Sequence, residues 1–156
     1  MTEGRSLYDQ GRYAEAVEAL ERAVLDYQQQ GNTLMTAVAY SNLSLCYQAM
    51  GRWPEAESAI TNSLDRLQSV YNPAVLAQAL DVKGQLQFAR GQDEAALNTW
   101  ETAADLYAEE GDTIGLTRNG INQAEAMQSL GLYRRAIALL NDLLPPLQAE
   151  PPSRLQ

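Results

Sequence analysis

The chain repeats itself with a period of 40 residues. A glycine recurs at one phase, an alanine follows it five residues later, and a large apolar residue follows the alanine after four more. A sequence that is self-similar at this spacing is a stack of supersecondary units, so the repeat decides the fold. The three columns are Gly11, Gly51, Gly91 and Gly131; Ala16, Ala56, Ala96 and Ala136; and Leu20, Ile60, Trp100 and Leu140.

The columns predict helices arranged in pairs. Each glycine follows a helical stretch and suits the left-handed position just after a helix, and the residues after it have apolar spacings of three and four. A fourth column, Asn32, Asn72 and Asp112, supplies the side chains preferred at helix N-caps, and Pro73 suits a first helical position. We therefore expect eight helices, over residues 2–10, 13–30, 33–50, 53–70, 74–90, 93–110, 113–130 and 133–144.

The expected fold is all-α, an α-α superhelix of about four helix pairs. One domain should span residues 1–148, with repeats near 1–30, 33–70, 73–110 and 113–148. Pro145 and Pro146 should end the last helix, because proline cannot continue its hydrogen-bond ladder. Residues 149–156 are expected to form a flexible tail. No stretch alternates with a period of two, so no sheet is predicted.

Composition excludes several kinds of chemistry. The 156 residues include no histidine and one cysteine, with 20 acids against 11 bases for a net charge of −9. Nucleophilic arrangements that use histidine are impossible, as are zinc sites with a histidine ligand, so we expect no enzyme activity, cofactor or metal. No basic patch favours nucleic acid, and no apolar run is long enough to span a membrane. The expected partner is a protein or peptide, and the expected location is cytoplasmic.

These elements resemble the tetratricopeptide repeat (TPR), a helix pair with a Leu-Gly-x2-Tyr element followed by Ala-x3-Phe. The first element stands here as Leu43-Ser44-x2-Tyr47, and the alanine and large apolar columns supply the second in all four repeats. The period exceeds the usual ~34 residues and resembles the longer-helix TPR variant of kinesin light chains. HEAT-type repeats share the longer period, but the glycine and alanine columns favour TPR.

A narrower resemblance is to the TPR regions of cyanobacterial CHAT proteins, which carry a caspase-like peptidase domain after their repeats. It rests on residues 11–16, 40–47 and 123–136. It implies that this chain is the sensor arm of a larger peptidase, whose catalytic domain must lie elsewhere because this chain has no histidine. A further alternative is a scaffold that self-associates through uncapped solenoid ends.

The TPR resemblance implies that the superhelix is right-handed and that the chain is a non-catalytic interaction module. The first helices of such a module line a concave groove for a peptide or partner helix. Asn42 and Asn122 occupy positions where long TPRs hold a peptide backbone, because an amide both donates and accepts; the alternative that each is merely exposed or caps a turn stays open. Carried over by register, the candidate groove residues are Asn42, Leu45, Gln48, Gln78, Asp81, Gln85, Arg118, Asn122 and Glu125.

The charges among these groove candidates bear on the partner. Only Arg5 and Arg118 are basic, which argues against a clamp on a terminal carboxylate. With Asp81 and Glu125 opposing them, the polar set suits an extended neutral or mildly basic segment, and the acidic balance of the chain would assist its association.

Two tryptophans and the cysteine are expected in the core instead of in a ligand site. Trp53 and Trp100 stand in repeat columns that otherwise hold tyrosine or aliphatic residues, and Cys46 lies inside a predicted first helix, where a lone cysteine is usually a small core residue. An acidic run in the third repeat is expected to be a solvated convex face; it comprises Glu101, Asp105, Glu109, Glu110 and Asp112.

Overall fold

The computed structural model describes residues 2–144, and within that range it contains eight α-helices and no strand. The helices are α1 (Thr2–Asp9), α2 (Tyr13–Gln29), α3 (Thr33–Ala49), α4 (Trp53–Leu67), α5 (Pro73–Ala89), α6 (Asp93–Glu110), α7 (Thr113–Ser129) and α8 (Tyr133–Leu143). The all-α prediction and its eight helices are confirmed. Helix α4 ends three residues before the predicted boundary at residue 70, because the chain leaves the helix to reach the N-cap at Asn72.

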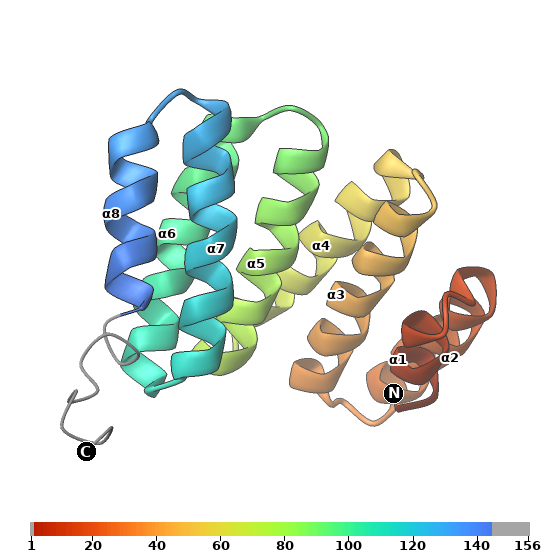
Figure 1. Ribbon diagram of the computed structural model, residues 1–156. Helices are drawn as coiled ribbons and strands as arrows, with labels where there is room; N and C mark the ends of the chain where they lie inside the picture. The colour runs from red at the N-terminus through yellow and green to blue at the C-terminus, as the bar shows by residue number, and fades with distance from the viewer. Residues whose placement is uncertain (1, 145–156) are drawn as a thin grey trace, which may run out of the picture.

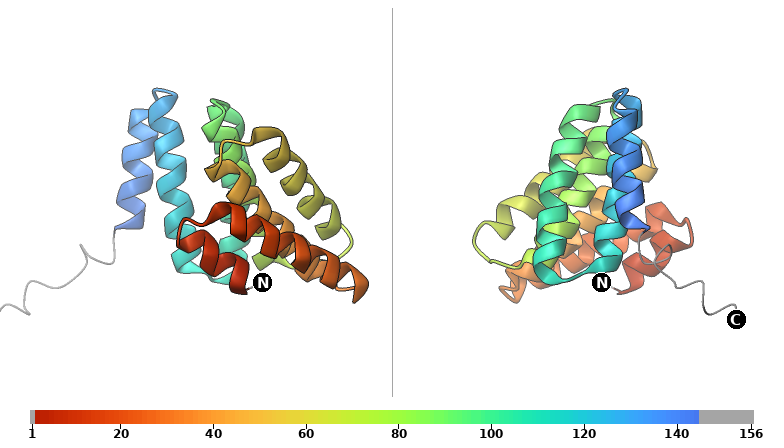
Figure 2. Two further views of the ribbon diagram at one scale, coloured as in Figure 1. Left: turned by 90° about the vertical axis from the view of Figure 1, so that its right-hand side faces the viewer. Right: turned by 60° about the vertical axis from the view of Figure 1, so that its left-hand side comes forward.

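The helices stack in chain order as a superhelix, each packed against the next (Figure 1). The odd-numbered helices form one layer, in which α3 contacts both α1 and α5. Helices α6 and α8 of the other layer lie in front in the right-hand view of Figure 2. Helices α1 and α8 are at opposite ends of the stack (Figure 1). The predicted tail at 149–156, the domain end at 148 and the role of Pro145 and Pro146 lie outside the described residues.

Local backbone chemistry explains where the helices begin and end. The side chains of Asn32, Asn72 and Asp112 accept hydrogen bonds from backbone amides three residues later, at 3.1, 3.0 and 2.9 Å respectively. These bonds satisfy amides that a helix leaves unpaired at its start. The predicted glycine column adopts positive φ throughout, for example +76° at Gly11 and +78° at Gly91. Both sets of sequence predictions are confirmed.

The large apolar column fills the space between helices. Trp100 is 2% exposed and packs with Leu97 and Met127, and its indole Nε1 donates to the Asp81 backbone carbonyl at 3.3 Å. It fits because Gly84 faces it: a Cβ at Gly84 would lie 2.3 Å from Trp100 Nε1. Cys46 is fully buried, and Trp53 packs half-buried against the part of the core that contains Ile60. All three residues are therefore structural, as expected.

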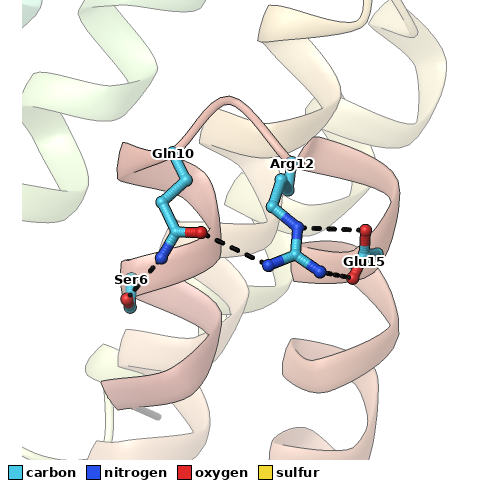
Figure 3. A network of polar contacts seen from close by, with 4 residues as sticks. All are labelled: Ser6, Gln10, Arg12 and Glu15. Carbon is cyan, nitrogen blue, oxygen red and sulfur yellow. Dashed lines mark hydrogen bonds and ion pairs between the residues drawn. The ribbon is translucent and has the colours of Figure 1, made fainter.

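The two ends of the stack carry different side chains. At the α1 end, Gln10 donates to Ser6 at 3.1 Å, and Arg12 joins Gln10 to Glu15, forming a polar network on exposed residues (Figure 3). At the other end, α7 and α8 expose large apolar side chains. This C-terminal apolar face comprises Ile114, Ile121, Tyr133, Ile137 and Leu144.

Candidate functional site

A hollow of about 370 Å³ lies on the face formed by the odd-numbered helices, and we call it the concave hollow. Helices α3, α5 and α7 supply most of its lining, α1 contributes one residue, and α6 contributes a tyrosine that reaches in from behind. The lining residues are Arg5, Val38, Ser41, Asn42, Leu45, Val75, Gln78, Asp81, Val82, Gln85, Tyr107, Arg118 and Asn122.

Most of the sequence-predicted groove residues meet in this hollow. Those that line it are Asn42, Leu45, Gln78, Asp81, Gln85, Arg118 and Asn122. Two others do not. Gln48 donates from Nε2 to the Val82 carbonyl and to Ser44 Oγ, both at 3.2 Å, so it ties α3 to α5 instead of facing the hollow. Glu125 is exposed on α7, outside the lining.

The α1 end of the hollow is held by a polar contact across two helices. Arg5 Nη1 on α1 donates to Asn42 Oδ1 on α3 at 3.2 Å. The Arg5 guanidinium also lies 5.6 Å from the centre of the Tyr8 ring, a cation–π distance. A ligand that reaches Asn42 therefore meets a guanidinium beside the amide.

The middle of the hollow contains a half-buried carboxylate, that of Asp81. Asp81 accepts a hydrogen bond from the Tyr107 hydroxyl through Oδ2 and another from Asn119 Nδ2 through Oδ1, at 2.8 Å for the second. Asn119 is fully buried and also donates to the Trp100 carbonyl at 3.0 Å, and its Oδ1 accepts from Gln123 at 2.7 Å. The network fastens α5 to α6 and α7, so Asp81 both lines the hollow and holds these three helices together.

Burial shifts the pKa of the two acids in this network. Desolvation raises the pKa of Asp81 above its ordinary value, although the hydrogen bonds from Tyr107 and Asn119 and the charge of Arg118 oppose the rise. Desolvation also raises the pKa of Tyr107, and its bond to Asp81 raises it further. Tyr107 therefore stays protonated and donates to the carboxylate at neutral pH.

Sequence reasoning missed Tyr107 as a lining residue. It stands on the second helix of its pair, amid the acidic run that was assigned to a solvated face, yet it is only 4% exposed. The signal available in the sequence was an aromatic residue four positions after Ala103 and seven after Trp100, the spacing of the buried stripe of α6. The surrounding acids Glu101, Asp105, Glu109 and Glu110 are exposed, as expected.

The lining chemistry suits hydrogen bonding instead of acid–base catalysis. The charged side chains in it are Arg5, Asp81 and Arg118, so the lining has a single carboxylate. Gln78 and Gln85 are exposed amides between the two arginines, and each amide both donates and accepts. The expectation of a mildly basic ligand counted Glu125, which lies outside the hollow; the exposed charges within it are the two guanidinium groups.

Two other kinds of feature are absent from the described residues. Residues 2–144 contain no group of three or more cysteine or acidic side chains placed to hold a metal ion. Over the same range, no helix combines the length and the apolar character needed to cross a bilayer.

Comparison with protein families gives one match. A model described as tetratricopeptide repeat matches residues 2–69 and 35–109, which together cover more than half of the chain. Curated protein sequences give no match.

Solved structures share the fold. BtubC (BKLC) from P. vanneervenii superposes with a TM-score of 0.79 at 21% identity, over 94% of this chain and 63% of that one. A Podosopora anserina protein described as a kinesin light chain with nearly identical TPR-like repeats gives 0.78 at 22%, over 99% of this chain and 78% of that one. This chain thus spans less than two thirds of the BtubC chain, and at these identities the likeness concerns the fold alone.

Proposed function

Because this chain belongs to the tetratricopeptide repeat family, whose members generally mediate protein–protein interaction, we propose that it binds an extended segment of a partner protein in the concave hollow. Folds of this type are typically non-catalytic scaffolds, and the proposal assigns no reaction to the chain. The observation that carries it is the hollow itself, which gathers guanidinium groups from α1 and α7 and amide side chains from α3, α5 and α7.

The lining supports an extended ligand that crosses the helices. Asn42, Gln78 and Asn122 stand on α3, α5 and α7 in turn, so a peptide running across the stack meets one amide at each helix. Amide side chains can pair with both the N–H and the C=O of an extended main chain. Leu45, Val75 and Val82 add apolar contact between them.

The charges define which segments the hollow prefers. The Asp81 carboxylate already accepts from Tyr107 and Asn119, whereas the Arg5 and Arg118 side chains are exposed at opposite ends. A guanidinium group forms its strongest hydrogen bonds with carboxylates. We therefore favour a neutral or weakly acidic segment over a basic one.

The test begins with peptides selected on the immobilised protein from a random library, each then measured by fluorescence anisotropy. Asn42→Ala and Asn122→Ala should each weaken binding about fivefold, the effect of one net hydrogen bond. Asn141→Ala, at an exposed asparagine of α8 outside the hollow, is the matched control and should change nothing. Selected peptides whose affinity is the same for all three variants would contradict the proposal.

A second candidate, self-association, is favoured by the C-terminal apolar face. In the first repeat, Val17 and Val24 hold the positions of Ile137 and Leu144, and α3 buries both of them. Because the α1 end is polar, the face has no apolar counterpart there, and a symmetric pairing of two such faces is the arrangement that buries it. Light scattering should then detect a dimer that Ile137→Lys dissociates; a monomer at all concentrations would reject it.

The role as sensor arm of a CHAT-type peptidase stays a prediction from residues 11–16, 40–47 and 123–136. Its test is the full reading frame that encodes the chain. A caspase-like domain with a cysteine and a histidine downstream would support that role, and its absence would reject it.

A further inference from the structure

A second hollow, of about 430 Å³, lies on the opposite layer, between α2 and α4, and we call it the outer groove. Both helices pack against α3, which forms its floor. The lining residues are Glu21, Val24, Leu25, Gln28, Tyr40, Leu43, Tyr47, Glu55, Ser58, Ala59 and Asn62. None of them lines the concave hollow.

The spacing of the lining residues makes the outer groove suitable for binding a helix. Each flanking helix contributes residues at positions i, i+3, i+4 and i+7, from Glu21 to Gln28 on α2 and from Glu55 to Asn62 on α4. Seven residues of helix span roughly 10 Å, so the groove runs for two helical turns between parallel ridges. A helix laid between such ridges places its own i, i+3, i+4 and i+7 side chains in the groove.

The surface of the outer groove is apolar and aromatic. Leu25 is 59% exposed on its α2 edge, and Tyr40 and Tyr47 are half-buried on its floor beside the buried Leu43. The Arg66 guanidinium lies 4.7 Å from the centre of the Tyr40 ring, and the Arg52 guanidinium lies 5.1 Å from that of Tyr47. These cation–π contacts hold the two rings in place.

The two walls of the outer groove differ in how their acidic side chains are paired. Glu21 and Glu55 are its charged lining residues, one on each wall. Glu55 pairs with Arg52, whereas Glu21 faces the groove with a single hydrogen bond, accepted from the Tyr47 hydroxyl at 3.1 Å. The α2 wall therefore presents a carboxylate next to apolar surface.

The corresponding gaps further along the stack are different. Forty residues on, Leu80, Lys83 and Gln87 replace Tyr40, Leu43 and Tyr47. There, Thr99 Oγ1 on α6 donates to Gln87 on α5 at 2.7 Å. Eighty residues on, the Arg135–Glu101 pair spans the gap from α8 to α6 at 3.8 Å. An exposed leucine beside a floor of two tyrosines is thus peculiar to the first gap and is not a general consequence of the repeat.

We propose that the outer groove docks an amphipathic helix of a partner protein whose apolar face is bordered by lysine or arginine. The apolar face would cover Leu25, Tyr40 and Tyr47, and a basic residue of the partner would lie against Glu21. Burial of leucine and tyrosine surface supplies affinity, and the opposite charges set the orientation and speed the encounter.

The probe is a fluorescently labelled peptide of about 15 residues, long enough to be helical when helix-favouring residues are chosen. It carries leucines at i, i+3, i+4 and i+7 with lysines on both sides of that stripe. A second peptide has glutamate in place of every lysine, and a third has the lysine peptide's composition in scrambled order. The lysine peptide should bind the wild-type protein and shift backbone amide signals of residues 21–28 and 55–62; the other two should not.

Variants then locate the contact. Leu25→Ser should weaken binding about tenfold or more, because a leucine no longer contributes its buried surface, and its exposure leaves the fold intact. Glu21→Gln should weaken binding and flatten its salt dependence, whereas Glu18→Gln removes the same charge from an exposed site on α2 outside the groove and should do neither.

Each alternative outcome is distinct. Equal effects of Glu21→Gln and Glu18→Gln would reduce the contact to general charge attraction and overturn the proposal, as would equal binding of all three peptides or binding of none. A dimer of the free protein that Leu25→Ser dissociates would assign the groove to a second copy. Because Asn42→Ala and Asn122→Ala leave the outer groove unchanged, failure here and failure of the concave-hollow proposal are separable.

Discussion

The second repeat, α3–α4, and the third, α5–α6, make the same crossing with different side chains. Ile60 and Trp100 occupy one column and both are buried. Another column, on the first helices, also differs. In the second repeat it holds Ser44, which donates to the Ala56 carbonyl at 2.9 Å. In the third it holds Gly84, which faces Trp100 with no room for a side chain. Between these two repeats, the larger residue of one column thus stands with the smaller residue of the other.

The polar contacts between helices also differ between the second and third repeats. In the second repeat Ser41 and Ser63 share a hydrogen bond of 2.8 Å, and Ser63 reaches the Ala37 carbonyl at 2.7 Å. In the third, Asp81 replaces Ser41, and its partners Tyr107 and Asn119 come from two different helices. The second repeat therefore has a neutral hydrogen bond between its own two helices. The third has an ionisable side chain on α5 that contacts both α6 and α7, so its stability depends more on the following repeat.

The largest expected effect is at the paired apolar column. Trp100→Ala should lower the free energy of unfolding by about 3–5 kcal/mol, because it leaves a large cavity and an empty space over Gly84. Ile60→Ala, the same change in the second repeat, should cost about 2–4 kcal/mol. Urea unfolding followed by circular dichroism measures both. Equal losses would mean that the larger side chain adds no packing to the third repeat.

The buried amide comes next. Asn119→Ala should cost about 2–3 kcal/mol, because Asp81 and Gln123 each lose a partner in a buried setting. Ser63→Ala should cost about 1 kcal/mol, since its partners are one hydroxyl and one carbonyl. If the serine variant proves the more destabilised by chemical denaturation, the third repeat does not depend on its cross-helix contact.

Gly84→Ala should destabilise the fold by about 1–3 kcal/mol, the usual cost of overpacking. The added methyl group would collide with Trp100, so most of the cost should disappear when Trp100→Ala is already present. Ser44→Ala with Ile60→Ala is the matched pair of the second repeat. A double-mutant cycle in which the Gly84 pair couples no more strongly than this control would contradict this steric account.

The smallest effect is a dependence of stability on pH that arises at Asp81 in the third repeat. The pKa of Asp81 is raised by burial, so the folded state holds the proton more tightly than the unfolded chain does. Its contribution to stability is complete below the ordinary carboxyl pKa and is lost as the pH rises through the folded-state pKa. The stability of the wild type relative to Asp81→Asn should therefore fall between acidic and neutral pH, as thermal melts would show.

Ser41→Ala provides the control for this titration, because a hydroxyl at the same column does not ionise in that range. Its stability difference from the wild type should stay constant with pH. A wild-type advantage over Asp81→Asn that instead grows toward neutral pH would mean that the hydrogen bonds from Tyr107 and Asn119 outweigh desolvation.

The features that sequence reasoning predicted are those set by nearby residues or by the repeat itself. The caps at Asn32, Asn72 and Asp112 and the turn at Gly11 depend on a few neighbouring positions, and the hollow follows from register. Tyr107 and Asn119 were not predicted, because their roles arise only when α5, α6 and α7 meet. Gln48 was placed in the hollow by family register, but in this chain its reach to the Val82 carbonyl turns it toward α5.

Chemical labelling of the buried Cys46 can report local unfolding of the protein. Burial raises the pKa of this thiol to about 11 and leaves its surface inaccessible between α2 and α3. Since only an exposed thiolate reacts with alkylating reagents, modification must wait until these helices separate. With no second cysteine in the chain, the labelling rate measures the local opening of the first two repeats under native conditions. A cysteine introduced on the surface would therefore be labelled by a dye while Cys46 remains unlabelled.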